Sequence, residues 1–224
     1  MILAVDAGNT AVTLGCVEGR EILNLARLAT SPGRSADEYA VLMERVLSLR
    51  GVKLREFEGA AIASVVPPLT EVLREAVRLI TGHDALVVGA GVKTGLNIGI
   101  DDPSQMGADL VAGAVAALDA HSPPVIIIDM GTATTFSYLS ESTYKGCVII
   151  PGVRIAVEAL SGRAAELPHI SLEQPPSIFG RSTIDAMRSG VLYGNAAMMD
   201  GMIQRITEEL GEPPTVVATG GMAQ

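Results

Sequence analysis

Two short segments of the sequence bring a carboxylate, a glycine and small polar residues together in the same order. The first segment is MILAVDAGNT, at residues 1–10, and the second is PVIIIDMGTA, at residues 124–133. In each, an apolar run typical of a buried strand ends at an aspartate, one residue follows, and then come a glycine and a small polar residue. Asp6 and Asp129 are 123 positions apart (129 − 6 = 123), so the repeat predicts two related halves.

These residues are suited to holding the phosphate groups of a nucleotide. Gly8 and Gly131 let the backbone turn without a side chain in the way of a phosphate. Residues 9–10 and 132–135 supply amide and hydroxyl donors. The aspartates cannot touch an anionic phosphate directly, so they would hold Mg²⁺ or another cation, with water between, that bridges to the phosphates. One Asp-x-Gly segment alone is usually an ordinary turn, but two copies, each between a strand and a hairpin, favour a function.

Strands and helices alternate around both copies of the motif. The pattern predicts strands at residues 1–5, 11–17, 21–28, 59–66, 125–128, 133–139, 144–150 and 215–218, and helices near residues 36–49, 67–80, 106–120, 153–163 and 183–209. Alternation of this kind is typical of an α/β sheet. The segment HSPP, at residues 121–124, is typical of a linker, and we expect two domains, at residues 1–118 and 119–224.

Composition and charge exclude several classes of partner. The chain has 224 residues, 48% of them hydrophobic, which is enough to bury a core for one large domain or two smaller ones. Its net charge of −9 repels nucleic-acid phosphate, so DNA and RNA are not expected partners. The N-terminus lacks the basic segment of a signal peptide, and the apolar helix predicted at residues 106–120 is too short and too polar to span a bilayer. We expect a cytoplasmic protein with no membrane partner.

The sulfur-containing residues and the histidines predict structural roles. Cys16 and Cys147 lie far apart in strand-like apolar segments, so we expect two buried, reduced thiols. The three histidines are scattered without the spacing of metal ligands. Met198, Met199 and Met202 recur along one predicted helix, where they would pack a core or a dimer face.

The sequence resembles the type III pantothenate kinases, also called the Baf family of transcriptional activators, over essentially its whole length. Four segments carry the likeness in the expected order: DAGNT at 6–10, DMGTATT at 129–135, GRST at 180–183 and TGG at 219–221. DxGTATT is the most specific of these, whereas TGG alone would be weak. The family belongs to the superfamily of acetate and sugar kinases, heat-shock proteins and actin. The resemblance implies two duplicated actin-like (ribonuclease H-like) domains, with mixed sheets flanked by helices and an ATP cleft between the domains.

The resemblance also implies roles for individual residues. ATP contacts are implied for Asp6, Ala7, Gly8, Asn9, Thr10, Gly131, Thr132, Gly220 and Gly221. A substrate loop is implied at Gly107, Ala108, Asp109 and Leu110, with Asp109 as the catalytic proton acceptor. Asp129 would hold a monovalent cation, K⁺ or NH₄⁺, and Asp6 would hold Mg²⁺ through water. Thr183 would contact the substrate across the interface of a homodimer.

The activity that this resemblance implies is ATP-dependent phosphorylation of pantothenate to 4′-phosphopantothenate, the first step of coenzyme A biosynthesis. In such a reaction the primary hydroxyl attacks the γ-phosphorus, and a carboxylate orients the hydroxyl and takes its proton late. Asp109 has an alternative explanation, because a carboxylate in the first turn of a helix also stabilises the helix dipole.

Two positions depart from the family pattern. Members carry a tyrosine at the position of Ile100 in this chain, and an arginine at the position of Leu110. Arginine binds a carboxylate through two parallel hydrogen bonds, and leucine offers none. Two other functions therefore stay open: a nucleotide-binding, regulatory relative with impaired catalysis, or a kinase for another small hydroxylated acceptor. The family also continues with further helix beyond the TGG segment, so either the sequence is truncated at Gln224 or the second domain lacks a final helix.

Overall fold

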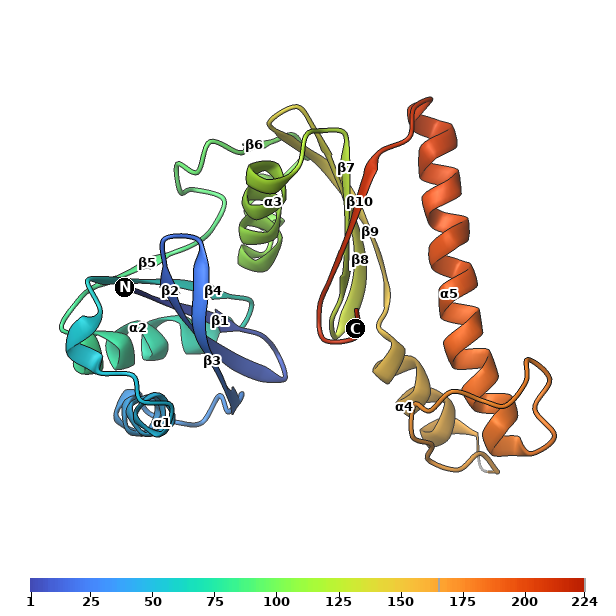
Figure 1. Cartoon of the computed structure of the whole chain (residues 1–224), viewed down its shortest axis with the longest axis horizontal. Helices are drawn as coiled ribbons and strands as arrows, with labels where there is room; N and C mark the ends of the chain where they lie inside the picture. Colours follow the sequence, from blue (N-terminus) through green and yellow to red (C-terminus); the bar gives the residue numbers. More distant parts are fainter. Residues whose placement is uncertain (165, 224) are drawn as a thin grey trace. The chain divides into compact units, whose positions relative to one another are not determined.

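The computed structural model describes residues 1–164 and 166–223. Ala165 lies outside it, as does Gln224, the last residue of the second expected domain. The chain divides into two compact units, Met1–Ala116 and Ala117–Gln224 (Figure 1). The boundary lies within helix α3 (Ala108–Ala120). No helix within the described residues is both long enough and apolar enough to cross a membrane.

The first unit is built on a mixed sheet with the strand order β3-β2-β1-β4-β5. Its strands are β1 (Ile2–Ala7), β2 (Ala11–Glu18), β3 (Glu21–Ala29), β4 (Gly59–Ser64) and β5 (Ala85–Val87). β2 runs antiparallel to both of its neighbours, β1 and β3, whereas β4 is parallel to both β1 and β5. The carboxyl ends of β1 and β4 therefore meet at the same edge of the sheet.

Helices cover one face of this sheet. α1 (Ala36–Leu49) is capped at its N-terminus by Ser35, which forms a capping box with Glu38. α2 (Pro67–Thr81) begins at a proline, a residue suited to the first helical turn. The remaining elements are η1 (Leu54–Glu56), β6 (Asn97–Ile98) and η2 (Pro103–Gln105). Leu3 and Val5 of β1 are buried with residues of both helices. Because strand residues alternate, Asp6 points to the opposite face.

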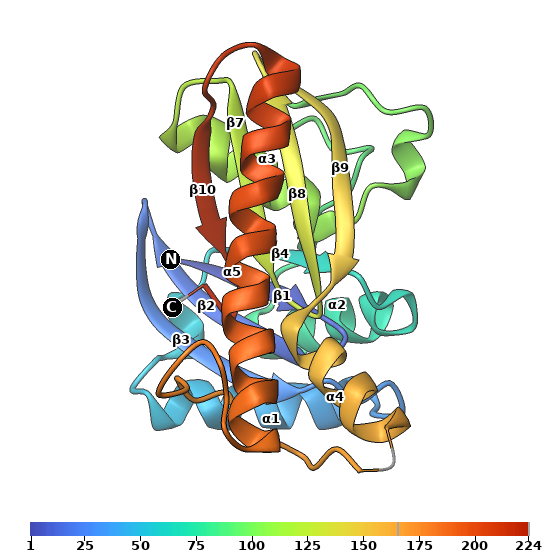
Figure 2. The ribbon, with the colours of Figure 1, turned by 90° about the vertical axis from the view of Figure 1, so that its right-hand side faces the viewer.

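The second unit repeats this plan. β7 (Val125–Met130), β8 (Ala133–Ser140) and β9 (Thr143–Pro151) are antiparallel, and β10 (Thr215–Thr219) joins β7 in parallel, in the order β10-β7-β8-β9. α4 (Val153–Arg163) and α5 (Thr183–Leu210) follow β9. Figure 2 shows α5 lying along this sheet. The prediction of an α/β fold with two mixed sheets flanked by helices is confirmed.

The core of the second unit confirms one prediction about the sulfur residues and corrects another. Met198, Met199 and Met202 of α5 pack against Ile126, Ile128 and Phe136, as expected of core residues. Both cysteines are free, and burial raises the pKa of the Cys16 thiol. Cys147 is exposed, so the prediction that both thiols are buried is wrong. Three consecutive residues of β9, Cys147, Val148 and Ile149, are exposed, so an apolar strand does not by itself predict burial.

Candidate functional site

The first Asp-x-Gly hairpin joins β1 to β2. Asp6 is exposed, and its register partners are Thr13 of β2 and Ala63 of β4. Residues paired in this way point to the same face of a sheet, so the carboxylate and the Thr13 hydroxyl project next to each other, away from α1 and α2. Four residues, Gly8 to Ala11, lie between the last paired residues Ala7 and Val12, and this loop closes with a hydrogen bond of 3.0 Å from Gly8 N–H to Ala11 O.

Thr30, directly after β3, holds this loop in place. Its Oγ1 donates a hydrogen bond of 2.6 Å to Gly8 O, and its N–H donates one of 3.2 Å to Thr10 O. Both bonds use carbonyl oxygens of the loop, so Thr30 controls the loop's shape. Asn9 and Thr10 are themselves exposed. The sequence analysis missed Thr30. A polar residue at the end of the strand that pairs with β2 is the signal that would have found it.

A buried tyrosine supports the segment that carries Thr30. Tyr39 of α1 is fully buried, and its hydroxyl accepts a hydrogen bond of 2.9 Å from Ser31 N–H and donates one of 3.2 Å to Ser31 O. The backbone next to Thr30 is therefore fixed to α1, and the hairpin is supported through Thr30 by a helix of the core.

The second Asp-x-Gly hairpin joins β7 to β8. Asp129 is partly buried, and its register partners are Thr135 of β8 and Thr219 of β10. The loop has three residues, one fewer than the first, and closes with a hydrogen bond of 3.1 Å from Gly131 N–H to Ala133 O. An aspartate–threonine pair across the first two strands is thus present in both units.

Gly152, between β9 and α4, packs directly on the second loop. Its N–H donates a hydrogen bond of 3.2 Å to Thr132 O. A Cβ at Gly152 would overlap Thr132 O and lie 2.6 Å from Gly131 O, which is closer than real Cβ atoms come to oxygen. Only glycine fits here without movement of the loop. Thr132 itself is exposed.

Gly220, directly after β10, packs on the other side of Asp129. Its φ is +95°, and a Cβ there would lie 2.5 Å from Asp129 Oδ1 and 2.6 Å from Met130 N. Two residues on, Met222 N–H donates a hydrogen bond of 3.3 Å to Met130 O. Gly221 has no such constraint, because nothing lies within 4 Å of a Cβ placed on it. The second hairpin is therefore enclosed by two glycine segments.

The residues around Asp129 fit an oxygen-binding monovalent cation. Thr135 Oγ1 is buried and has no hydrogen-bond partner within the part of the chain that is described. A buried hydroxyl without a partner is costly, so this oxygen next to a carboxylate is a candidate ligand for a cation. A carboxylate and a hydroxyl are oxygen donors of the kind that K⁺ takes, and both can accept hydrogen bonds from NH₄⁺.

A divalent metal ion would have fewer protein ligands than the monovalent cation. Across the described ranges 1–164 and 166–223, no three His, Cys, Asp or Glu side chains gather to form a metal-binding group. Mg²⁺ commonly keeps several waters and binds one or two carboxylates together with substrate phosphates. The exposed Asp6 carboxylate fits that mode of binding.

The predicted acceptor loop lies at the same edge of the first sheet as the first hairpin. Val65, directly after β4, donates from its N–H to Ala7 O at 3.0 Å, and its Cγ1 lies 3.6 Å from a Cβ placed on Gly107. Asp109 is exposed in the first turn of α3, and its Oδ1 accepts a hydrogen bond of 2.8 Å from Leu110 N–H. That carboxylate folds back over Gly107, where a Cβ would overlap it.

The segment before this loop is ordered by another aspartate. The Ser104 hydroxyl donates a hydrogen bond of 2.6 Å to Asp102, and Ser104 N–H and the Gln105 amide each donate one of 3.0 Å. These donors, with the Ser104 hydroxyl first, lower the pKa of the Asp102 carboxyl. Ile100 and Leu110 are partly buried, and neither brings a polar group to the loop.

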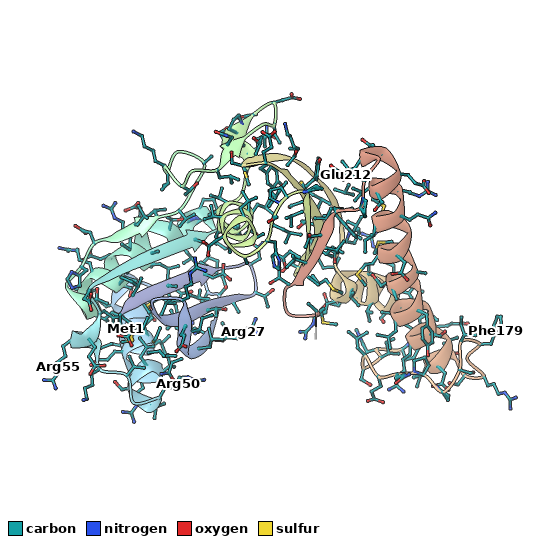
Figure 3. All side chains as sticks on the ribbon, turned by 45° about the horizontal axis from the view of Figure 1, so that its top comes forward. Met1, Arg27, Arg50, Arg55, Phe179 and Glu212 are labelled. Carbon is teal, nitrogen blue, oxygen red and sulfur yellow. The ribbon has the colours of Figure 1, made fainter. Side chains whose placement is uncertain are left out.

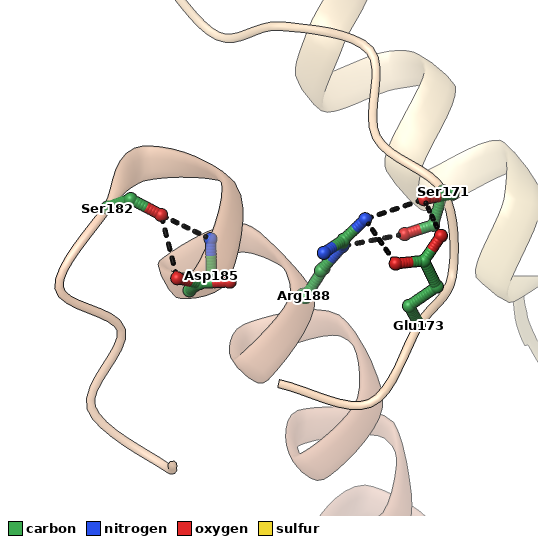
Figure 4. A network of polar contacts seen from close by, with 5 residues as sticks. All are labelled: Ser171, Glu173, Ser182, Asp185 and Arg188. Carbon is green, nitrogen blue, oxygen red and sulfur yellow. Dashed lines mark hydrogen bonds and ion pairs between the residues drawn. The ribbon is translucent and has the colours of Figure 1, made fainter. Parts of the chain in front are cut away.

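Thr183 is the first residue of α5, in the second unit, and it is exposed. Ser182 caps the helix: its Oγ accepts a hydrogen bond of 3.1 Å from Asp185 N–H and donates one of 2.9 Å to Asp185 Oδ2 (Figure 4). Asp185, in the first turn, also complements the helix dipole. The backbone direction at Thr183 is thereby fixed by its neighbours.

An arginine fixes the loop that leads into α5. Arg188 donates a hydrogen bond of 2.7 Å to Ser171 Oγ and forms an ion pair of 2.8 Å with Glu173 Oε2 (Figure 4). Ser189 Oγ donates to Ile178 O, farther along the same loop. The loop before Thr183 is therefore joined to α5 at several points.

The predicted site residues thus fall into three groups. The first unit brings together Asp6, Ala7, Gly8, Asn9 and Thr10 with Gly107, Ala108, Asp109 and Leu110. The second unit brings together Asp129, Gly131, Thr132 and Gly220, with Gly221 next in the chain. Thr183 belongs to the second unit but to neither hairpin.

Comparison with known proteins identifies the family. The profile of the family described as Type III pantothenate kinase matches residues 2–205. The type III pantothenate kinase of Moorella thermoacetica is 42% identical over 224 residues, covering 100% of this chain and 88% of the relative. That of Exiguobacterium sp. is also 42% identical, over 225 residues, with the same coverage.

Solved structures are similar in fold. A Sinorhizobium meliloti protein assigned as a 2-dehydro-3-deoxygalactonokinase has a TM-score of 0.56 at 13% identity, covering 100% of this chain and 92% of its own. A Campylobacter jejuni protein assigned to the Baf family of transcriptional activators has a TM-score of 0.54 at 18% identity, covering 89% and 78%. The actin-like fold that the family resemblance implies is confirmed. With its family profile matched over residues 2–205 and full-length relatives at 42% identity, the chain belongs to the type III pantothenate kinase family.

Proposed function

We propose that the chain transfers the γ-phosphate of ATP to the primary hydroxyl of pantothenate, which yields ADP and 4′-phosphopantothenate, the first step of coenzyme A biosynthesis, in the cytoplasm. Membership of the family supports this activity. The structural observation that carries it is the position of Asp109, two residues after Gly107, which lies beside Val65 at the same sheet edge as the first Asp-x-Gly hairpin.

Asp109 is the proton acceptor in this proposal. The acceptor oxygen forms a bond to the γ-phosphorus, the bond from that phosphorus to the β-bridging oxygen breaks, and Asp109 takes the hydroxyl proton. Transition states of this type are loose, so alignment of the hydroxyl matters more than the strength of the base. Asp109 is exposed, and Leu110 N–H donates to its Oδ1, which fixes one carboxylate oxygen and leaves the other for the substrate.

Each unit supplies one phosphate-binding hairpin in this proposal. The backbone donors are those of residues 8–10 in the first unit and 131–132 in the second, where Gly220 and Gly221 contact the adenosine. Asp129 and Thr135 hold K⁺ or NH₄⁺, and Asp6 holds Mg²⁺ through water. When bound, these cations neutralise charge on the phosphates.

A homodimer completes the acceptor site in this proposal, with Thr183 of one subunit contacting the substrate of the other. The fixed loop before α5 supports such a role, because Arg188 and Ser189 hold it to the helix and Thr183 is exposed at its end. Small-molecule substrates are the only partners that the proposal requires besides the second subunit.

Ile100 and Leu110 favour a second candidate function, which is phosphorylation of a neutral hydroxylated acceptor. Neither side chain can bind a carboxylate, and both are partly buried. Losing a charged hydrogen bond costs about 1.5–3 kcal/mol, so pantothenate affinity would fall by about ten- to a hundred-fold against a site with arginine. A regulatory relative would instead bind ATP and release no ADP.

The experiment that tests the proposed function is an assay of acceptor-dependent ADP release with Mg²⁺ and NH₄⁺ present. We expect release with pantothenate, and Asp109→Asn should lower kcat by about 10²–10⁴-fold while ATP affinity stays unchanged. Asp101→Asn, which removes a nearby exposed carboxylate, serves as the control. The same assay with pantothenol, the neutral alcohol analogue, compares a neutral acceptor with pantothenate. A higher kcat/KM for pantothenol would favour the second candidate, and ATP binding without release would contradict both.

A further inference from the structure

Arg27 lies on the same face of the first sheet as Asp6. It is the only lysine or arginine in strands β1–β5. Its register partner is Thr13, which in turn pairs with Asp6, so the three side chains form a row across β3, β2 and β1. Neighbouring strands are about 4.8 Å apart, which puts the backbone of Arg27 about 10 Å from that of Asp6. An extended arginine side chain and a bound phosphate group together span this gap.

The guanidinium of Arg27 has no assigned role within its own unit. The residue is exposed, and no hydrogen bond or ion pair of its side chain is found among residues 1–164 and 166–223. Arg34, Arg78 and Arg188, by contrast, all bind carbonyl or carboxylate oxygens. A guanidinium offers five N–H donors in a planar fork that matches phosphate oxygens. In a chain of net charge −9, such a group next to a phosphate-binding loop opposes the repulsion of a polyanion.

The order of the strands places Arg27 on the side of Asp6 away from the acceptor. Asp109 approaches from the β4 side, through Gly107 and Val65. Arg27 lies on β3, two strands away on the other side. The γ-phosphate must face the acceptor. The guanidinium of Arg27, on the opposite side of Asp6, therefore faces the β-phosphate, which leaves with ADP. Thr30, at the end of the same strand, also contacts the phosphate loop.

We propose that Arg27 binds the β-phosphate of the donor nucleotide and neutralises the charge that develops on departing ADP. This role rests on the proposed function, because it assumes that the first hairpin binds the phosphates of ATP. It adds a positively charged contact to a site otherwise built from backbone amides and carboxylates. Such a contact acts on both the bound nucleotide and the transition state.

Calorimetry with ADP and AMP on Arg27→Ala, Arg27→Lys and Arg55→Ala tests this role. Arg55 lies at the far side of the same unit and is exposed, so its removal changes the net charge equally (Figure 3). We expect Arg27→Ala to raise the Kd for ADP by about ten- to a hundred-fold and the Kd for AMP by less than about twofold. Arg27→Lys should recover part of the ADP affinity, and Arg55→Ala should have almost no effect.

Three results would overturn the role of Arg27 while leaving the proposed function in place. The first is an unchanged ADP affinity in Arg27→Ala, and the second is an equal loss of ADP and AMP affinity in that variant. The third is a loss of ADP affinity in Arg55→Ala as large as that in Arg27→Ala. In each case the wild-type chain must bind ADP and turn over pantothenate. A wild-type chain that binds neither ADP nor ATP would overturn the proposed function itself. Because Arg27 is exposed, its variants should keep the wild-type melting temperature, which confirms that the fold is intact.

Discussion

The two Asp-x-Gly hairpins share one motif but are supported in different ways. Each places an aspartate opposite a threonine of the next strand, Asp6 with Thr13 and Asp129 with Thr135. The first loop is held by the hydroxyl and N–H of a single residue, Thr30. The second is one residue shorter and lies between two glycine segments that leave no room for a side chain.

This difference predicts different tolerance of change. A Cβ on Gly8 would lie 3.4 Å from Ala11 O, an ordinary contact, so the first loop has space around its glycine. At Gly152 and Gly220 a Cβ would overlap backbone or carboxylate atoms. Close packing makes the second loop a rigid, preformed site, whereas hydrogen bonds that can break and reform support the first.

The largest effect that this comparison predicts is that of Gly220→Ala. The new Cβ meets Asp129 Oδ1 and Met130 N, and the φ of +95° is strained for alanine. Strain and overlap together should lower the free energy of unfolding by about 2–5 kcal/mol and abolish measurable ATP binding. Urea unfolding and calorimetry measure the two effects.

Two alanine variants serve as controls for that prediction. Gly221→Ala places its Cβ in open space, and Gly8→Ala meets only an ordinary contact, so both should keep stability within about 0.5 kcal/mol of wild type. Equal stability of Gly220→Ala and Gly221→Ala would show that the second loop is not enclosed as tightly as the structure indicates.

The sequence predicted the parts of these hairpins that are local. An aspartate, a glycine and an apolar run are adjacent in the chain, so the repeat, the strands and the α/β fold follow from pattern alone. The aligned motifs, however, hide the different loop lengths, because register depends on which residues pair across the strands. Pairing also decides that Thr13 and Thr135 occupy equivalent positions.

Contacts from distant segments could not be predicted in this way. Thr30 contacts the first loop from its position directly after β3, 22 positions further along the chain than Gly8. Gly152 contacts the second loop from the turn after β9. Glycine and threonine are common in turns, so neither residue type signals its partner. The prediction for Cys147 was wrong for a related reason: burial depends on what packs over a strand, and Cys147, Val148 and Ile149 of β9 are all exposed.

A smaller effect is expected for Thr30→Val, which removes the hydrogen bond to Gly8 O but keeps the shape of the side chain and the N–H bond to Thr10 O. Loss of one such bond costs about 1 kcal/mol of stability. With the first loop less ordered, the Kd for ATP should rise by about two- to fivefold. Thr30→Ser keeps the hydroxyl and should retain wild-type affinity; if Ser and Val weaken ATP binding equally, the hydroxyl does not hold the loop.

The smallest effect is expected for Thr135→Val, and it sharpens the comparison because Thr13→Val is the matched change in the first hairpin. Thr135 Oγ1 is buried and unpaired among the described residues, so without a cation its removal should leave stability unchanged or raise it by up to about 1 kcal/mol. In KCl, the wild-type chain should melt at a higher temperature than in choline chloride of equal ionic strength. Binding of K⁺ to the folded state alone produces that increase. Thr135→Val should lose most of it, whereas Thr13→Val should keep it, since Thr135 Oγ1 is the hydroxyl that is both buried and unpaired among the described residues. Equal increases in all three chains would show that the Thr135 hydroxyl is not a ligand, and that the two hairpins differ in packing alone.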